Sequence, residues 1–513
     1  MRKLGLLFLF SNVIWLAACG GSGGSSSSTV TSVNVSCSPS TVGSGGTSQC
    51  SATVSGTGSF NSTVTWSTSA GSITTSGVLT APTVTAMTTV TVTATSAQNT
   101  SVSGTASVIV NPTTSGSNVA PIIVDAGPQN IGSVNVAYVT VTVCVPGTNN
   151  CQNIDHVQVD TGSEGLRLLS SASGGELTLP LTQETVGSNP VDECLVFADG
   201  YVWGGVYTAT VTVSSETASN VPIHVLIPAT SSPGVPTTCS NQNPSGGAGN
   251  EGGSVTSFGA NGLIGVGVFQ NDCGGYCESQ GASCNGTSGA PCVYYQCPSS
   301  GCTATNLPVA QQVPNPVTLF ATDNNGVLIQ LPSVGDGGQS DVAGSLIFGI
   351  GTQSNNSLSL AANVYFVPDD TNNSGDIITV YNGQSYPSSF LDSGSNGLFF
   401  LDTSTTGIPT CTGFTGSSDW YCPTTSPDTL SVTNQGQGNS GPVGNPIQVS
   451  FSIENAGTLF NTNNTAFSTL GGPNTGAFDF GLPFFYGKYV FTAIDLQSVS
   501  GCGTNCTGPF FAY

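Results

Sequence analysis

Short segments in which apolar and polar residues alternate recur along almost the whole chain. In "TTVTVTATSA", "TASVIVNP" and "YTATVTV" the alternating apolar residues are mainly Val and Ile, and clusters of Gly, Pro, Asn and Ser separate such segments. Alternation with a period of two predicts strands with one buried face, and the clusters predict turns. Because no helix-period repeat of any length occurs after residue 120, the sequence predicts an all-β protein.

Residues 31–112 form the first predicted unit. Six short alternating segments follow one another there at regular spacing, which is the pattern of a β-sandwich. Their order, together with "VTWS" and "SGVLTAPT", resembles the bacterial immunoglobulin-like (Ig-like) group 2 domain, and this resemblance implies that Trp66 lies in the core. Residues 113–124 are predicted to be a linker that leads into a continuous all-β region.

The N-terminus predicts export. Arg2 and Lys3 precede a mostly apolar run that is too short to span a membrane as a helix. The ending "LAAC" resembles a bacterial lipobox, which implies a lipoprotein signal peptide over residues 1–18, cleavage before Cys19 and lipidation of the Cys19 thiol. A plain signal peptide is the alternative.

Residues 19–30 are predicted to be a flexible Gly/Ser tether. Gly20 follows the lipidated cysteine, and among bacterial lipoproteins this favours the outer membrane. We therefore expect an outer-membrane lipoprotein of the bacterial cell envelope, exposed to the periplasm or the exterior. The membrane would be contacted only through the lipid at Cys19.

Charge excludes some classes of partner. The chain has 513 residues with 26 acidic and 4 basic side chains, and a formal net charge of −22. Its length is too great for one ordinary domain. Removal of the leader would leave Arg167 and Lys488 as the two remaining cations. Nucleic acid is therefore not expected as a partner, because its binding requires a basic footprint.

Cysteine usage also indicates an oxidising compartment. Seventeen Cys are present, so an even number remains once Cys19 is set aside. Six of them crowd an insert at residues 272–303, where zinc is the alternative to disulfides, but no Cys-x-x-Cys spacing and no His occurs in that stretch. No metal and no cofactor are therefore expected. The short-range pairs predicted as disulfides elsewhere are Cys37/Cys50, Cys144/Cys151, Cys411/Cys422 and Cys502/Cys506.

Two related turns carry the candidate chemistry. Asp160-Thr161-Gly162-Ser163 is matched by Asp392-Ser393-Gly394-Ser395, and the apolar flanks "GLRLL" and "GLFFL" correspond as well. Two carboxylates that face each other at hydrogen-bond distance cannot both ionise, so such a pair holds one proton. The Gly permits a tight turn, and the hydroxyl three residues after each Asp is placed to orient its carboxylate.

At these turns the chain resembles the pepsin-like aspartic peptidases. The resemblance implies a bilobal double-β-barrel domain, with an N-terminal lobe at residues 125–340 and a C-terminal lobe at residues 341–513. It implies that Asp160 and Asp392 activate a water that hydrolyses a peptide bond. The remaining residues of the two turns (Thr161, Gly162, Ser163, Ser393, Gly394 and Ser395) would support the two aspartates.

Further motifs extend this resemblance. "NGLIGVGVF" and "FDFGLPFFYGKYVFTAID" resemble the apolar-apolar-Gly motifs of the family, and "FADGYVWGGVYTATVTV" resembles its flap hairpin. The first two imply a set of active-site loop residues: Leu263, Ile264, Gly265, Phe480 and Gly481. The third implies a set of flap residues: Phe197, Asp199, Gly200 and Tyr201.

The chain also departs from the family at two positions. Phe197 stands where the flap usually has Tyr, unless Tyr201 takes that place, and Arg167 stands where the supporting Trp is usual. Arg167 is expected to pair with Glu164 or with an acidic group of the substrate, and a surface Arg beside a Glu is the alternative.

The sequence therefore predicts a surface-anchored, monomeric aspartic endopeptidase that acts on peptide or protein substrates. The alternative is a catalytically weak or inactive pepsin-fold lipoprotein that serves binding or adhesion. A Ser/His/Asp triad is not expected, because His156 and His224 both lie in strand-like runs away from any nucleophile-elbow pattern.

Overall fold

The computed structural model describes residues 28–38, 41–43, 45–84, 88–111, 118–198, 200–231, 234–242, 251–287, 290–367, 375–438, 441–502 and 506–513. Across these ranges the protein is all-β, as the alternating pattern predicts, and its α-helices have only four or five residues each. They are α1 (Thr237–Ser240), α2 (Val255–Phe258), α3 (Gly275–Ser279), α4 (Thr403–Thr406) and α5 (Ala456–Leu459). No helix in these ranges is long and apolar enough to cross a membrane. The predicted signal peptide, Cys19 and Asp199 lie outside the described residues.

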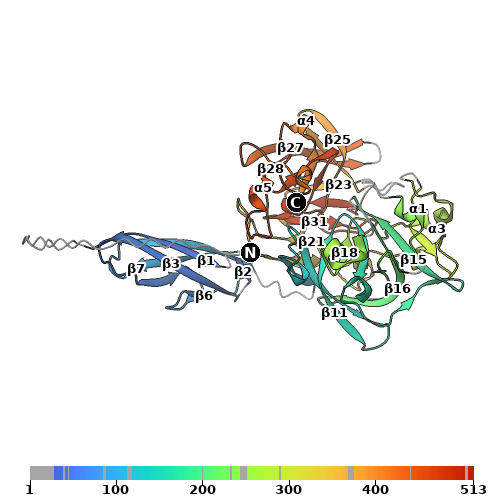
Figure 1. Cartoon of the computed structure of the whole chain (residues 1–513), viewed down its shortest axis with the longest axis horizontal. Coiled ribbons are helices and arrows are strands. Elements are labelled where there is room, and N and C mark those ends of the chain that lie inside the picture. The colour runs from blue at the N-terminus through green and yellow to red at the C-terminus, as the bar shows by residue number, and fades with distance from the viewer. Residues whose placement is uncertain are drawn as a thin grey trace, which may run out of the picture.

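The first unit consists of two four-stranded sheets and projects from the rest of the molecule (Figure 1). One sheet has the order β1 (Thr29–Ser38), β3 (Thr47–Thr57), β6 (Val78–Thr80) and β5 (Ser72–Ile73). The other has the order β2 (Thr41–Gly43), β8 (Ser103–Asn111), β7 (Thr88–Ser96) and β4 (Val64–Thr68). Both sheets contribute to one apolar core, against which Trp66 packs half-buried. The Ig-like assignment of this unit stays a prediction.

The remaining strands form two sheets. The first is a closed barrel of β9 (Val119–Val124), β10 (Ala137–Cys144), β11 (Cys151–Asp160), β12 (Glu164–Leu169), β13 (Thr182–Gln183), β14 (Thr185–Val186), β15 (Asn189–Val196), β16 (Tyr201–Val213), β17 (Glu216–Leu226), β18 (Gly262–Val266), β19 (Tyr294–Gln296), β20 (Thr303–Ala304), β21 (Gly326–Gln330), β22 (Val342–Phe348), β23 (Val364–Phe366), β31 (Tyr489–Ala493) and β32 (Phe510–Ala512). The second has the order β28 (Gly441–Ile453), β27 (Asp428–Gly438), β24 (Ile377–Tyr381), β25 (Gln384–Leu391), β30 (Asn474–Phe480), β26 (Leu398–Leu401) and β29 (Gly471–Gly472). One large apolar core runs through both sheets, and Figure 1 shows the second sheet beside the barrel.

The same three-strand arrangement occurs once in each sheet. In the barrel, β18 runs parallel to β11 and antiparallel to β12, so that Ile264 pairs with both Val159 and Leu166. In the second sheet, β30 runs parallel to β25 and antiparallel to β26, so that Phe480 pairs with both Leu391 and Leu398. Each Asp turn connects the first two strands of its arrangement, which gives the two turns equivalent surroundings.

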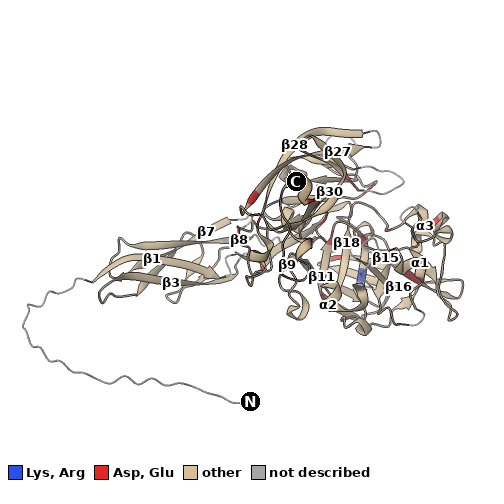
Figure 2. Ribbon diagram, turned by 45° about the horizontal axis from the view of Figure 1, so that its top comes forward, with Lys and Arg blue, Asp and Glu red and all other residues tan. Residues whose placement is uncertain are grey.

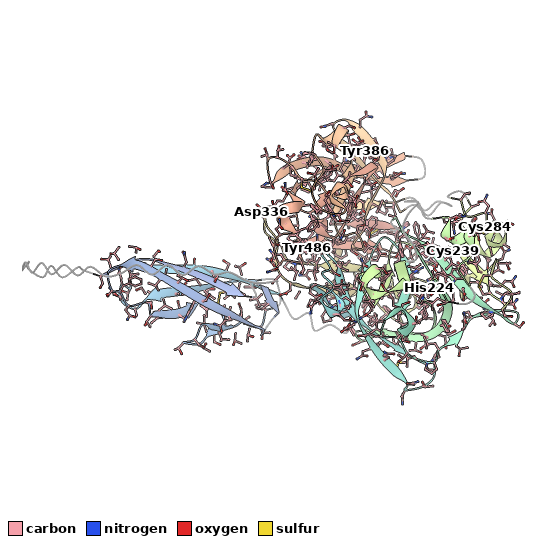
Figure 3. The ribbon with its side chains drawn as sticks, in the orientation of Figure 1. His224, Cys239, Cys284, Asp336, Tyr386 and Tyr486 are labelled. Atoms are coloured by element: carbon pink, nitrogen blue, oxygen red, sulfur yellow. A yellow bond between two sulfur atoms is a disulfide. The ribbon has the colours of Figure 1, made fainter. Side chains whose placement is uncertain are left out.

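Disulfides are numerous, as the cysteine count predicts. The four predicted pairs are present, and the six cysteines of the insert form three further disulfides. The eighth disulfide joins Cys194 of β15 to Cys239 of α1. Figure 3 shows Cys239 and Cys284 on the same side of the molecule, where β19 of the insert pairs with β15. The insert is therefore fixed to the predicted flap hairpin.

Candidate active site

The two turns bring Asp160 and Asp392 together, although 232 positions separate them in the sequence. Asp160 ends β11 and is 5% exposed, whereas Asp392 follows β25 and is half-buried. Their side chains are hydrogen-bonded to each other. A Cβ atom added to Gly162 would lie 2.7 Å from Cγ of Asp392, and one added to Gly394 would lie 2.6 Å from Oδ1 of Asp160. Each glycine therefore leaves the space that the opposite carboxyl occupies.

Each carboxyl is oriented by its own turn in the same way. The amide of Gly162 donates to Oδ1 of Asp160 at 2.7 Å, and the hydroxyl of Ser163 donates to Oδ2. The amide of Gly394 donates to Oδ1 of Asp392 at 2.7 Å, and the hydroxyl of Ser395 donates to Oδ2 at 2.7 Å. The hydroxyls thus lie where the spacing of the motif predicts.

Thr161 and Ser393 lock the two turns together through buried reciprocal hydrogen bonds. Oγ1 of Thr161 donates to the carbonyl of Leu391 at 3.1 Å and accepts from the amide of Ser393 at 2.9 Å. Oγ of Ser393 donates to the carbonyl of Val159 at 2.8 Å and accepts from the amide of Thr161 at 3.1 Å. Each hydroxyl both donates and accepts across the two turns, so the relative position of the turns is fixed.

Electrostatics favour one proton on the pair. Burial, the negative charge of Asp392 and the hydrogen bond between the carboxyls raise the pKa of Asp160 well above its usual value, against the opposing effect of Ser163 and Gly162. The pair therefore keeps a proton to a higher pH than a solvated aspartate would. One carboxyl of such a pair can accept a proton while the other donates one.

We expect Gly394→Ala to destabilise the fold, because the added methyl group overlaps Oδ1 of Asp160. Inserting a methyl group into a packed site costs about 1–3 kcal/mol. The control is Gly335→Ala, where an added Cβ meets nothing within 4 Å and the change is expected to stay within about 0.5 kcal/mol. Urea unfolding of both variants measures the difference, and equal effects would contradict the close approach of the two turns.

The other predicted site residues are distributed as follows. Leu263, Ile264 and Gly265 lie on β18, and Phe480 ends β30, directly before Gly481. The predicted flap is a hairpin of β15 and β16, closed by a bond from the amide of Phe197 to the carbonyl of Gly200 at 2.8 Å. Phe197 packs with one apolar cluster and Tyr201 with another, which is rich in disulfides. Their role in binding substrate stays a prediction.

Arg167 corrects one prediction, because it is neither a surface residue nor an ion-pair partner of the Glu164 carboxylate. Its side chain is fully buried, and Nη1 donates to the backbone carbonyl of Glu164. Nη2 bonds Oε1 of Glu193 at 2.9 Å and Oδ2 of Asp272 at 3.2 Å. Charged residues are otherwise sparse on the described chain (Figure 2). A buried cation requires a charged partner at close range, and the Glu193 carboxylate provides it here, whereas burial raises the pKa of Asp272 well above its usual value.

Two further residues complete this buried cluster. The hydroxyl of Tyr294 donates to both carboxylate oxygens of Asp272, at 2.8 and 2.9 Å, and accepts from the amide of Val313 at 2.8 Å. Nδ1 of His224, which Figure 3 labels, lies 3.3 Å from Oε2 of Glu193, and burial lowers the pKa of His224 to about 4. The cluster therefore ties β12, β15, β17 and the Cys-rich insert together. Sequence reasoning placed His224 in a strand but missed its partners.

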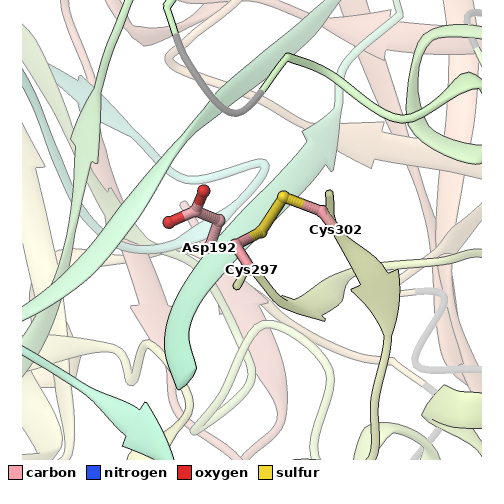
Figure 4. A group of neighbouring side chains, drawn as sticks. All are labelled: Asp192, Cys297 and Cys302. Atoms are coloured by element: carbon pink, nitrogen blue, oxygen red, sulfur yellow. A yellow bond between two sulfur atoms is a disulfide. The ribbon is translucent and has the colours of Figure 1, made fainter. Parts of the chain in front are cut away.

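Asp192, Cys297 and Cys302 are grouped like metal ligands, with their ligand atoms within 4.8 Å of one another (Figure 4). Cys297 and Cys302 are joined as a disulfide, however, so neither sulfur is a thiolate. Zinc requires deprotonated thiols. This group is therefore not a metal site.

The fold and the site together define an all-β protein in which two equivalent Asp turns meet. Residues 114–513 match the family described as "Protein of unknown function (DUF3443)", and the chain belongs to this family. A search of the curated proteins found no match. Among solved structures, the chain is similar to an aspartic proteinase from Irpex lacteus, with 14% identity, a TM-score of 0.40, and coverage of 77% of this chain and 96% of that chain.

Proposed function

We propose that the chain is an aspartic endopeptidase that hydrolyses peptide bonds with water activated between Asp160 and Asp392. The observation that carries the proposal is the hydrogen-bonded pair of carboxyls, each oriented by an amide and a hydroxyl of its own turn. Surface anchoring through a lipid at Cys19, the Ig-like unit and the pepsin-like bilobal assignment belong to the same proposal.

The proposed reaction uses both protonation states of the pair. The ionised carboxyl takes a proton from the water, and the water oxygen bonds to the scissile carbonyl carbon. The protonated carboxyl donates its proton to the carbonyl oxygen, which gives a neutral tetrahedral diol. Collapse of the diol breaks the C–N bond: one diol hydroxyl gives its proton to the ionised carboxyl as its oxygen becomes the new carbonyl, and the protonated carboxyl donates its proton to the leaving amine. The pair ends with one proton, as it began.

The pH dependence tests this proposal. Because the pKa of Asp160 is raised, the shared proton is retained at acid pH and lost as the pH rises through that pKa. We therefore expect cleavage of an unfolded protein substrate to be fastest at acid pH and to fall as the pH rises through the raised pKa of Asp160. A statyl-type transition-state mimic is expected to block it.

The assay also separates the peptidase from the binding protein. Absence of inhibitor-sensitive cleavage at every pH from about 3 to 7 would remove the catalytic proposal. Saturable binding of peptides without turnover would then favour a binding lipoprotein on the same fold.

A further inference from the structure

A third buried carboxyl, that of Asp479, lies beside the aspartate pair. Asp479 is on β30, where its Cα pairs with those of Phe390 on β25 and Phe399 on β26. Phe478 and Phe480 on either side of it are both core residues with 1% exposure. Because side chains alternate along a strand, Asp479 faces away from that core. It is nevertheless only 8% exposed.

The number of hydrogen bonds that the Ser395 hydroxyl can donate determines whether Asp479 acts as donor or acceptor. The Ser395 hydroxyl interacts with the Asp479 carboxyl, and this hydroxyl already donates to Oδ2 of Asp392 at 2.7 Å. A serine hydroxyl has one proton to donate and can accept further bonds. Asp479 can therefore bond Ser395 without breaking the bond to Asp392 only if Asp479 is the donor.

Asp479 can donate a hydrogen bond only while its carboxyl is protonated, and its surroundings favour this neutral form. Burial and the negative charges of Asp392 and Asp160 raise the pKa of Asp479 well above its usual value, and a bond donated by Ser395 would oppose this only in part. Its neighbours across β25 and β26 are the apolar Phe390 and Phe399. Oδ1 of Asp479 has no hydrogen-bond partner within the described part of the chain, which fits a neutral acid better than an ion.

The equivalent position on β18, in the barrel, shows that this three-strand arrangement does not require a carboxyl. Ile264 of β18 corresponds to Phe480 of β30 by its pairings, so Leu263 corresponds to Asp479. Leu263 is 4% exposed. One half therefore accommodates an apolar side chain at this position, and the other carries an acid beside the pair.

We propose that Asp479 is a positioning residue for the proposed peptidase: as a neutral acid it donates to Ser395, which in turn holds Oδ2 of Asp392. This inference rests on the proposed function. When Asp479 ionises, the single proton of Ser395 has two competing acceptors, and Asp392 loses part of its orientation. The fall in activity with rising pH would then reflect the ionisation of Asp479 as well as the loss of the proton that Asp160 and Asp392 share.

Two substitutions of Asp479 test whether it positions Ser395 as a neutral donor. Asp479→Asn keeps a donor, the amide N–H, that does not ionise, so kcat at acid pH is expected to stay within about threefold and the alkaline limb to move to higher pH. Asp479→Leu copies the first half and removes the donor, so kcat is expected to fall about tenfold with little change in KM, as for loss of one hydrogen bond. Equal kcat values for both variants and the wild type would overturn the proposal, as would an equal loss in both.

A different outcome would assign Asp479 another role. If Asp479→Leu and Asp479→Asn instead raise KM selectively for substrates with a basic side chain, Asp479 binds substrate directly and the positioning role is wrong. Matched peptides that differ only in Lys against norleucine provide this comparison.

A second readout does not depend on cleavage. An acid whose pKa is raised by folding stabilises the fold at low pH, and this contribution is lost as the pH rises through the raised pKa. Urea unfolding of Asp479→Asn between about pH 4 and about pH 7 is therefore expected to show a smaller decline in unfolding free energy than the wild type. An identical decline would overturn the neutral-acid proposal. A smaller decline together with an inactive wild type would instead locate the failure in the proposed peptidase function.

Discussion

Replacing Asp160 with Asn is expected to lower the rate of peptide cleavage by at least about 10³-fold. The variant keeps the size of the side chain but removes the proton that the pair shares, and a positioned acid or base contributes about 10²–10⁴-fold. Asp392→Asn is expected to have the same effect. The double variant should lose little more than either single one, because the two groups act as a unit. Single-turnover cleavage at the acid optimum measures the loss.

The matched control for this experiment is Asp192→Asn. Asp192 is also 5% exposed, and burial raises its pKa to about 6, but it lies on β15 and accepts from Gln183 instead of from the turns. Its replacement is expected to leave cleavage within about twofold, because the reacting groups are untouched. Asp160→Asn should not destabilise the fold at neutral pH, since it removes a carboxyl whose ionisation is disfavoured by folding. Residual cleavage above a tenth of the wild-type rate would contradict the assigned role.

Replacing Arg167 with Met is expected to lower the unfolding free energy by about 3–5 kcal/mol. Met fills similar space but leaves Glu193 and Asp272 without their cation, and an uncompensated buried charge is costly. Adding Glu193→Gln to Arg167→Met should restore part of the loss, because it removes the charge left unpaired. Urea unfolding at neutral pH, where Glu193 is ionised, measures both variants.

Lys488→Met is the comparison for Arg167, since these are the two cations of the predicted mature chain. Lys488 is half-buried, donates to the carbonyl of Phe484 at 2.6 Å and lies 4.1 Å from the centre of the Phe484 ring. Loss of these contacts is expected to cost about 1 kcal/mol. A similar cost for Arg167→Met would contradict the assignment of Arg167 as the centre of a buried ion cluster.

Local patterns predicted the strands and the two Asp turns. Strand alternation is set by neighbouring residues, and each turn carries its own Gly and Ser, so both are visible within short segments. The matching flanks of Asp160 and Asp392 then indicated that the turns meet. The interlocking by Thr161 and Ser393 is the three-dimensional reason why both turns carry a hydroxyl directly after Asp.

Contacts between residues far apart in the sequence could not be predicted from such local patterns. The partners of Arg167 are 26 and 105 positions away in the sequence, and the Cys194–Cys239 disulfide spans 45 positions. No local spacing identifies such pairs. Asp479 carried a signal that was available: it is an acid within "FDFG", where the first half has the apolar "LIG". Comparison of the two halves residue by residue would have singled it out.

The reciprocal bonds of Thr161 and Ser393 also have a consequence for how the chain is made. They join residues 230 and 234 positions apart, so the first turn is synthesised long before the second. Until residue 393 has been added and folded, Asp160 lacks the charge and the hydrogen bond by which Asp392 raises its affinity for protons. A nascent or truncated chain that ends between the turns therefore holds no paired site. The chemistry of the pair comes into existence only in a finished molecule, as a late step of its own assembly.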